Sequence, residues 1–192
     1  MADIRSTKAP APFRIVFMGT PDFALPSLRA LHANPDVAKI VAIYTQPDRP
    51  AGRGQKIAKP PVKIVGEELG YPIRQPENIN TPDERKFLAD HMADFFIVVA
   101  YAQFLSSGVL NLPRGYCINV HSSLLPKFRG AAPIQYAIWK GEKESGVTTM
   151  KLVPKMDAGP ILLQKIIRLI PPFQARRDSF LKSPSTQCYA AW

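Results

Sequence analysis

The stretch that decides the fold reads Cys117-Ile-Asn-Val-His-Ser-Ser-Leu-Leu-Pro-Lys-Phe-Arg-Gly-Ala-Ala-Pro133, a short apolar run followed by a loop with proline and glycine. Side chains alternate along an extended backbone, so Asn119 and His121 leave one face of the strand end while Val120 faces the core. If residues 117–120 form a central strand, the pair lies outside its carboxyl end, where open α/β sheets bind ligands. We therefore expect the chemistry of this protein there.

Further apolar runs, separated by segments with helical spacing, extend along the chain in both directions. The run at 94–101 is almost wholly apolar, which is typical of a strand covered on both faces, so we place it centrally. The alternation predicts an α/β fold with a mostly parallel, six- or seven-stranded sheet and helices on both faces, a Rossmann-like arrangement. The strands are expected at 13–18, 39–45, 72–75, 94–101, 116–120, 145–153 and 160–170, and the helices at 22–33, 61–70, 81–92 and 132–140.

The composition is that of an ordinary globular protein. With 192 residues, 46% apolar and 21% charged, one domain is expected, preceded by a loose lead-in at 1–12. No apolar run has the roughly 18 residues of a membrane helix, and residues 1–10 lack the apolar stretch of a secretory signal. We expect a cytoplasmic protein without membrane contact, with the mitochondrial matrix as the alternative. Cys117 and Cys188 have neither disulfide-framework nor zinc spacing, so no metal is expected.

Two other chemistries are disfavoured by the residues. The turn after the first strand contains the single Gly19, and Asp22 would put negative charge where a pyrophosphate normally binds a helix N-terminus. This argues against a nucleotide cofactor. Ser122 and Ser123 follow His121, but no glycine-flanked serine of a nucleophile elbow is present. A serine nucleophile is therefore disfavoured as well.

A third polar group follows the strand expected at 145–153. Asp157 belongs to Lys155-Met-Asp-Ala-Gly159, where the glycine removes the steric bar to the turn and is expected to let the carboxylate approach a substrate closely. Asparagine, histidine and aspartate divide into an oxyanion donor, a proton-transfer group and an orienting group. We therefore predict a catalytic set made of Asn119, His121 and Asp157.

The segment 46–61 is rich in proline and glycine and is expected to be a loop. Five cations and no acid occur from Arg49 to Lys63, and the chain carries a net charge of +10. Such a run favours contact with RNA phosphates, and the alternative is a solvated surface loop whose charge is incidental. The cations are Arg49, Arg53, Lys56, Lys59 and Lys63.

Asn119, His121, the Ser123-Leu-Leu-Pro126 run, Arg129-Gly130 and Asp157 resemble the motifs of the folate-dependent formyltransferases. Gly19-Thr-Pro-Asp-Phe23 and Gln46 to Gly54 resemble specifically the branch that acts on methionyl-tRNA. The resemblance covers about residues 13–170, which we expect to be the catalytic domain. Residues 171–192 depart from the family pattern, and we expect this chain to be without the C-terminal barrel domain of the family.

The resemblance implies transfer of a formyl group from 10-formyltetrahydrofolate to the α-amine of methionyl-initiator tRNA, by a monomer and without a metal. It places the folate beside the backbone around 99–104 and the loop after His121, and it makes Arg53 the important cation for tRNA. Two alternatives stay open: a formyltransferase for a small amine such as a nucleotide-linked amino sugar, and a non-catalytic remnant that binds folate or RNA. The implied folate contacts are Val99, Tyr101, Phe104, Ser123, Leu124, Leu125 and Pro126, and the implied tRNA contacts are Arg49, Arg53, Lys56 and Arg129.

Overall fold

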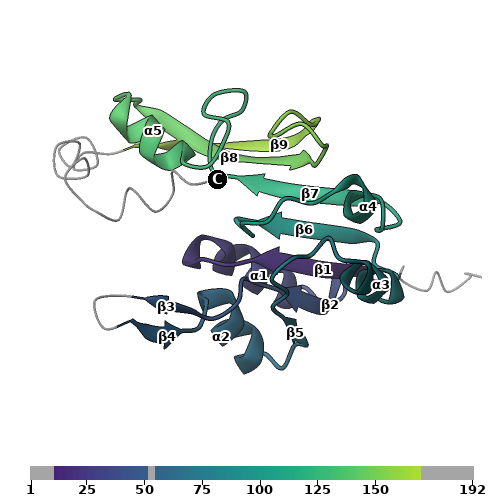
Figure 1. The fold of residues 1–192 in the computed structure, drawn as a ribbon. Helices are drawn as coiled ribbons and strands as arrows, with labels where there is room; N and C mark the ends of the chain where they lie inside the picture. The colour runs from purple at the N-terminus through teal and green to yellow at the C-terminus, as the bar shows by residue number, and fades with distance from the viewer. Residues whose placement is uncertain (1–10, 52–54, 170–192) are drawn as a thin grey trace, which may run out of the picture.

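A computed structural model describes residues 11–51 and 55–169 (Figure 1). Its main element is a seven-stranded sheet with the strand order β5-β2-β1-β6-β7-β8-β9. Four of the six neighbouring pairs are parallel, and the pairs β7–β8 and β8–β9 are antiparallel. The predicted α/β class and the mostly parallel sheet are confirmed. The strands are β1 (Phe13–Gly19), β2 (Ala38–Tyr44), β5 (Ile73–Arg74), β6 (Phe95–Val99), β7 (Tyr116–His121), β8 (Glu144–Lys151) and β9 (Ile161–Arg168).

The strand β6 lies in the middle of the sheet, as its apolar sequence predicts. Its side chains alternate between two cores, because Phe96 and Val98 belong to one buried cluster while Ile97 and Val99 pack in the other. This arrangement leaves β6 covered on both faces and directs its carboxyl end toward the same sheet edge as those of β1 and β7. The parallel strands thus provide the edge at which the site was expected.

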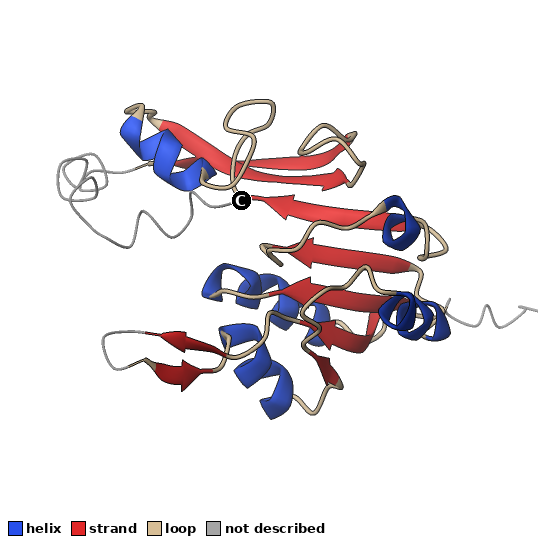
Figure 2. Cartoon of the chain, viewed as in Figure 1, coloured by secondary structure: helices blue, strands red, loops and turns tan. Residues whose placement is uncertain are grey.

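Helices cover both faces of the sheet (Figure 2). Leu28 of α1 (Leu25–His32) and Val62 of α2 (Pro61–Glu68) belong to one buried cluster, whereas Leu88 of α3 (Pro82–Asp90) and Val109 of α4 (Ser107–Leu110) belong to the other. The helix α3 begins as its sequence predicts, because the Thr81 side chain accepts a hydrogen bond from the Glu84 N–H at 3.3 Å. A 3-10 turn, η1 (Asp22–Ala24), precedes α1, and α5 (Pro133–Trp139) lies beside β8.

The antiparallel strands β8 and β9 close one side of the sheet. In β8 the residues Gly146, Thr148 and Met150 are buried and alternate with partly exposed neighbours. All eight residues of the edge strand β9 are exposed. The inward face of β8 meets the loop that follows β7, because a side chain at Gly146 would collide with Leu124. The loop after β7 therefore packs against the β8–β9 pair.

Two sequence predictions are corrected by the structure. The expected loop 46–61 contains an antiparallel hairpin of β3 (Arg49–Ala51) and β4 (Lys56–Ala58), and α4 lies between the strands expected at 94–101 and 116–120, where no helix was predicted. Both elements are short and the β4 residues are exposed, so they lack the apolar periodicity on which the prediction depends. The predicted lead-in up to residue 10, Arg53 and the tail from residue 170 onward lie outside the described residues.

Candidate active site

Asn119 and His121 lie on β7, and their registers show how the sheet positions them. Asn119 lies between Val98 of β6 and Met150 of β8, and His121 is the last residue of the strand, opposite Thr148. Val120 packs against the opposite core cluster. The two polar residues therefore share one face of the strand, as the alternation predicts.

The His121 ring is almost fully buried, and an oxygen lies near each of its two nitrogens. Its Nε2 lies 2.9 Å from the Phe128 carbonyl oxygen, which can only accept, so Nε2 carries the hydrogen. In the neutral ring Nδ1 then has the lone pair, and it lies 3.8 Å from the Asp157 carboxylate. The imidazole thus presents one fixed tautomer, with its basic nitrogen on the side of Asp157.

Asp157 reaches His121 by an indirect route. Because β8 is antiparallel to β7, its last residue Lys151 lies beside Ile118, about 10 Å along the strand from His121. Residues 152–160 leave there and double back, so that Asp157, at φ 46°, brings its carboxylate to the ring. The same Oδ2 accepts the Gly130 N–H at 2.8 Å, which ties the two loops together.

The two ends of this returning loop, at Lys151 and Pro160, are joined by backbone contacts. The Lys151 N–H donates to the Pro160 carbonyl at 3.0 Å, and the Lys151 carbonyl lies so close to Gly159 that a Cβ there would collide with it. The close approach at Gly159 is therefore made to the backbone at the start of its own loop, and the expected approach to a substrate stays a prediction.

The residues implied as folate contacts fall into two groups. Val99, Tyr101, Ser123 and Leu125 are buried as whole residues, so they present little surface to a ligand in this structure. Phe104 and Pro126 are exposed and Leu124 is partly exposed. Ser123 uses its hydroxyl within the loop, where it donates to the Lys127 carbonyl at 2.6 Å.

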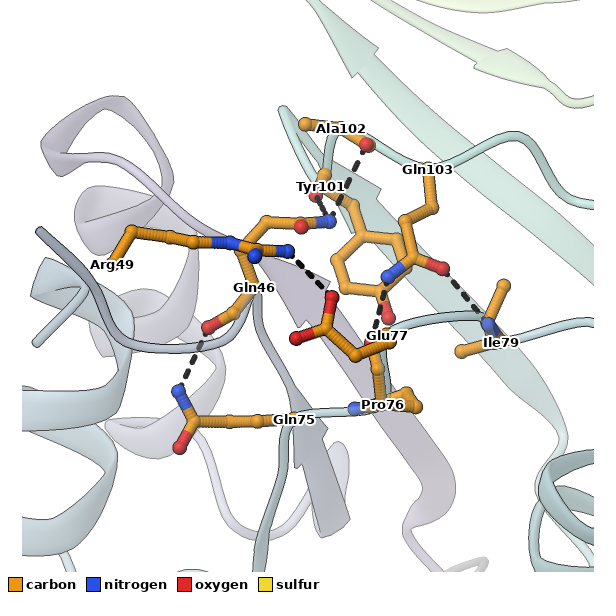
Figure 3. A network of polar contacts seen from close by, with 9 residues as sticks. All are labelled: Gln46, Arg49, Gln75, Pro76, Glu77, Ile79, Tyr101, Ala102 and Gln103. Carbon is orange, nitrogen blue, oxygen red and sulfur yellow. Dashed lines mark hydrogen bonds and ion pairs between the residues drawn. The ribbon is translucent and has the colours of Figure 1, made fainter.

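A set of side-chain amides fixes the backbone segments that follow β2, β5 and β6 (Figure 3). Gln46 donates to the Tyr101 carbonyl at 3.0 Å, and Gln75 donates to the Gln46 carbonyl at 2.8 Å. Gln103 accepts from the Ile79 N–H and donates to the Pro76 carbonyl, both at 2.8 Å. The segment 101–104, one of the two implied folate contacts, is therefore held at a fixed position.

The basic segment, which runs from Arg49 to Lys63, has acidic side chains beside most of its described cations. Acids from outside it pair with Arg49, Lys59 and Lys63, and among the described cations of the segment this leaves Lys56, which is exposed. Bonds from Gln75 and Lys63 hold the pKa of Asp48 below its ordinary value. Arg129, in the loop after β7, is exposed. The pairing acids are Glu77, Glu67 and Asp48, respectively.

The site also contains two polar residues that the sequence analysis missed. Thr148 of β8 and Gln164 of β9 bond the backbone of the loop after His121. A polar residue on the inward side of an alternating strand was the only signal for Thr148.

Within the ranges 11–51 and 55–169, no three His, Cys, Asp or Glu side chains form a group suited to a metal ion. Over the same ranges, no helix has the length and apolar character needed to span a bilayer.

The sequence is similar to curated bacterial proteins. It is 54% identical over 154 residues to the methionyl-tRNA formyltransferase of Desulfotalea psychrophila, covering 80% of this chain and 47% of that protein. It is also 54% identical over 149 residues to the methionyl-tRNA formyltransferase of Methylococcus capsulatus, covering 78% of this chain and 48% of that protein. The chain therefore spans about half the length of these relatives.

The fold is similar to that of solved structures, among them a formyltransferase and a deformylase. The phosphoribosylglycinamide formyltransferase of Bacillus halodurans matches with a TM-score of 0.67 and 20% identity over 92% of this chain and 98% of that one. A formyltetrahydrofolate deformylase of Pseudomonas syringae matches with a TM-score of 0.68 and 21% identity, over 91% of this chain and 57% of that one. The model of the formyl transferase family matches residues 13–178, eight residues beyond the predicted end at 170. The chain belongs to the formyl transferase family.

Proposed function

We propose that the chain transfers a formyl group from N10 of 10-formyltetrahydrofolate to the α-amine of methionine esterified to initiator tRNA. The observation that carries this proposal is the approach of Asp157 to His121, at 3.8 Å, beside Asn119 in a chain of the formyl transferase family. The choice of acceptor is supported by relatives at 54% identity that are named methionyl-tRNA formyltransferases.

The chemistry required is acyl transfer between two nitrogens. The amine attacks the formyl carbon, which gives a tetrahedral centre with negative charge on oxygen, and the bond to N10 then breaks. The Asn119 amide is the donor for that oxygen. The amine proton must go to a base and return to N10, and the lone pair of His121 Nδ1 suits this step because Phe128 occupies Nε2.

Asp157 supplies the charge that this proton transfer needs. When Nδ1 takes the proton, the imidazolium lies next to a carboxylate in a largely buried site, where Coulombic stabilisation is stronger than in water. Residues 122–130 also orient the imidazole through the Phe128 carbonyl and the carboxylate through the Gly130 N–H. None of these roles requires a metal, since the residues named handle both the oxyanion and the proton.

For the substrates, we assign folate to the backbone at 99–104 and to the loop 123–126. We assign tRNA to Arg53, Lys56, Arg49 and Arg129. The pairing of Arg49 with Glu77 means that RNA phosphates would compete with an acid for this residue, so Lys56 is expected to contribute more than Arg49. The enzyme is expected to act as a monomer in the cytoplasm.

The test compares acceptors for the labelled formyl group. Formyl-labelled 10-formyltetrahydrofolate is incubated with the chain and either methionyl-initiator tRNA or a nucleotide-linked amino sugar, and the label in each acceptor is counted. The proposal predicts transfer to the tRNA. Transfer to the sugar alone would make the chain a small-amine formyltransferase, and binding of folate without transfer to either would make it a non-catalytic protein.

The RNA contacts are tested separately by the salt dependence of binding. Removing one cation that contacts a phosphate reduces the slope of log affinity against log salt by about 0.7 to 0.9. Arg53→Ala should therefore bind tRNA more weakly and with a flatter slope than the parent chain. Equal affinity and an equal slope would contradict the proposed contact of Arg53 with tRNA phosphates and favour a solvated surface loop.

A further inference from the structure

Thr148 is a fully buried polar residue in the middle of β8. In the sheet register it lies opposite His121 of β7 on one side and Gln164 of β9 on the other. Its hydroxyl donates to the Ser123 carbonyl at 2.7 Å and accepts from the Leu125 N–H at 3.2 Å. A single hydroxyl thus binds both a carbonyl and an N–H of the loop that follows the histidine.

Gln164 completes this arrangement from the edge strand. Its Nε2 donates to the Thr148 hydroxyl at 2.9 Å and to the Leu125 carbonyl at 2.8 Å. A side-chain amide nitrogen has two hydrogens, and both are used here. Both backbone polar groups of Leu125 are therefore held by the pair, although Gln164 belongs to an edge strand whose residues are all exposed.

The loop of residues 123–130 is fixed at Leu125, and its other end contacts the candidate catalytic residues His121 and Asp157. Ser123 donates to the Lys127 carbonyl at 2.6 Å, which closes the turn between the two ends. The next carbonyl, that of Phe128, accepts from His121, and the Gly130 N–H donates to Asp157. A displacement of Leu125 would therefore be passed through a short, hydrogen-bonded turn to the imidazole and the carboxylate.

We propose that Thr148 and Gln164 are positioning residues for formyl transfer, which hold residues 123–130 so that the Phe128 carbonyl fixes the His121 tautomer and the Gly130 N–H fixes Asp157. This proposal rests on the function proposed above. Its physical basis is that small errors in the placement of reacting groups lower the rate strongly, while they affect binding less. Neither residue needs to contact a substrate for this role.

The experiment uses variants of the full 192-residue chain. Thr148→Val removes the hydroxyl with little change of shape, Thr148→Ser restores it, and Gln164→Met removes the amide from an edge strand where folding is least at risk. Thr149→Val is the matched control, because Thr149 is the next residue of β8, faces the other side, and has an exposed bond of 3.5 Å to the Leu163 carbonyl. Steady-state kinetics give kcat and KM, and NMR hydrogen exchange gives the protection of individual amides.

Thr148→Val and Gln164→Met should each lower kcat by about 10-fold to 100-fold with KM for methionyl-tRNA within about threefold of the parent. Thr148→Ser should recover kcat to within about threefold. The Leu125 and Gly130 amides should exchange about tenfold faster or more in Thr148→Val and Gln164→Met and not in Thr149→Val, because their hydrogen bonds would be broken or misaligned.

The proposal is overturned if both variants keep kcat and the Gly130 protection at the level of Thr149→Val, even where their melting temperatures fall, because that would be a purely structural role. If Thr148→Val fails to fold, Gln164→Met decides alone. If the parent chain transfers no formyl group, the proposed function fails, and the Gly130 exchange then decides whether the pair holds the loop.

Discussion

Replacing Asp157 by Asn tests whether the negative charge beside His121 is needed for formyl transfer. The side chain keeps its shape and an oxygen that can accept the Gly130 N–H bond of 2.8 Å, but it loses its negative charge. At the 3.8 Å that separates the carboxylate from His121 Nδ1, Coulomb's law with an effective dielectric constant of about 20 gives about 4 kcal/mol for a protonated ring. Since about 1.4 kcal/mol is a factor of ten, the rate of formyl transfer in a single turnover should fall about 10³-fold.

The assay is a single-turnover measurement of formyl transfer to methionyl-tRNA at saturating folate, which isolates the chemical step. Asp36→Asn is the matched control, since Asp36 is exposed and remote from the site, and its rate should equal that of the parent. Thermal melting should show both variants folded. A fall of less than about threefold in Asp157→Asn would refute the reasoning, because the imidazole would then not require the nearby charge.

Three further predictions concern the donor amide, the returning loop and the buried thiol. Asn119→Ala should lower kcat by about 10²-fold or more with little change in folate affinity in steady-state kinetics, and an unchanged kcat would remove Asn119 from the mechanism. Gly159→Ala should lower both the melting temperature and transfer, because its Cβ would collide with the Lys151 carbonyl, and a parent-like melting curve would contradict this. Burial raises the pKa of Cys117 to about 12, so its thiolate fraction at pH 8 is about 10⁻⁴ and rises about tenfold per pH unit. Iodoacetamide at pH 8, followed by peptide mass spectrometry, should leave Cys117 unmodified in the folded chain and label it in urea. Rapid labelling of the folded chain would show that the thiol is not buried.

The main sheet is predictable because its strands have strong local signals. In β6, alternate side chains enter two different cores, and such a strand must be apolar throughout. The β3–β4 hairpin gives no such signal, because its second strand, Lys56–Ala58, is exposed along its length. An exposed strand pair of this kind therefore cannot be predicted from the periodicity of apolar residues.

The site was partly predictable for a similar reason. Asn119 and His121 follow from alternation within a single strand, which is a local property. The contacts of Thr148 and Gln164 depend on the register of two antiparallel pairs, and that register is fixed by packing between distant segments. The pairing of Lys59 with Glu67 was missed because the acid lies outside the basic segment, in a helix that folds back on it.

The most direct test of the account is the transfer of a labelled formyl group from 10-formyltetrahydrofolate to methionyl-initiator tRNA by the 192-residue chain, measured beside its His121→Ala variant. The account predicts labelled formylmethionyl-tRNA with the parent and a rate lower by about 10²-fold or more with the variant. Equal rates for the parent and the variant, or no transfer by a parent chain shown to be folded, would contradict it.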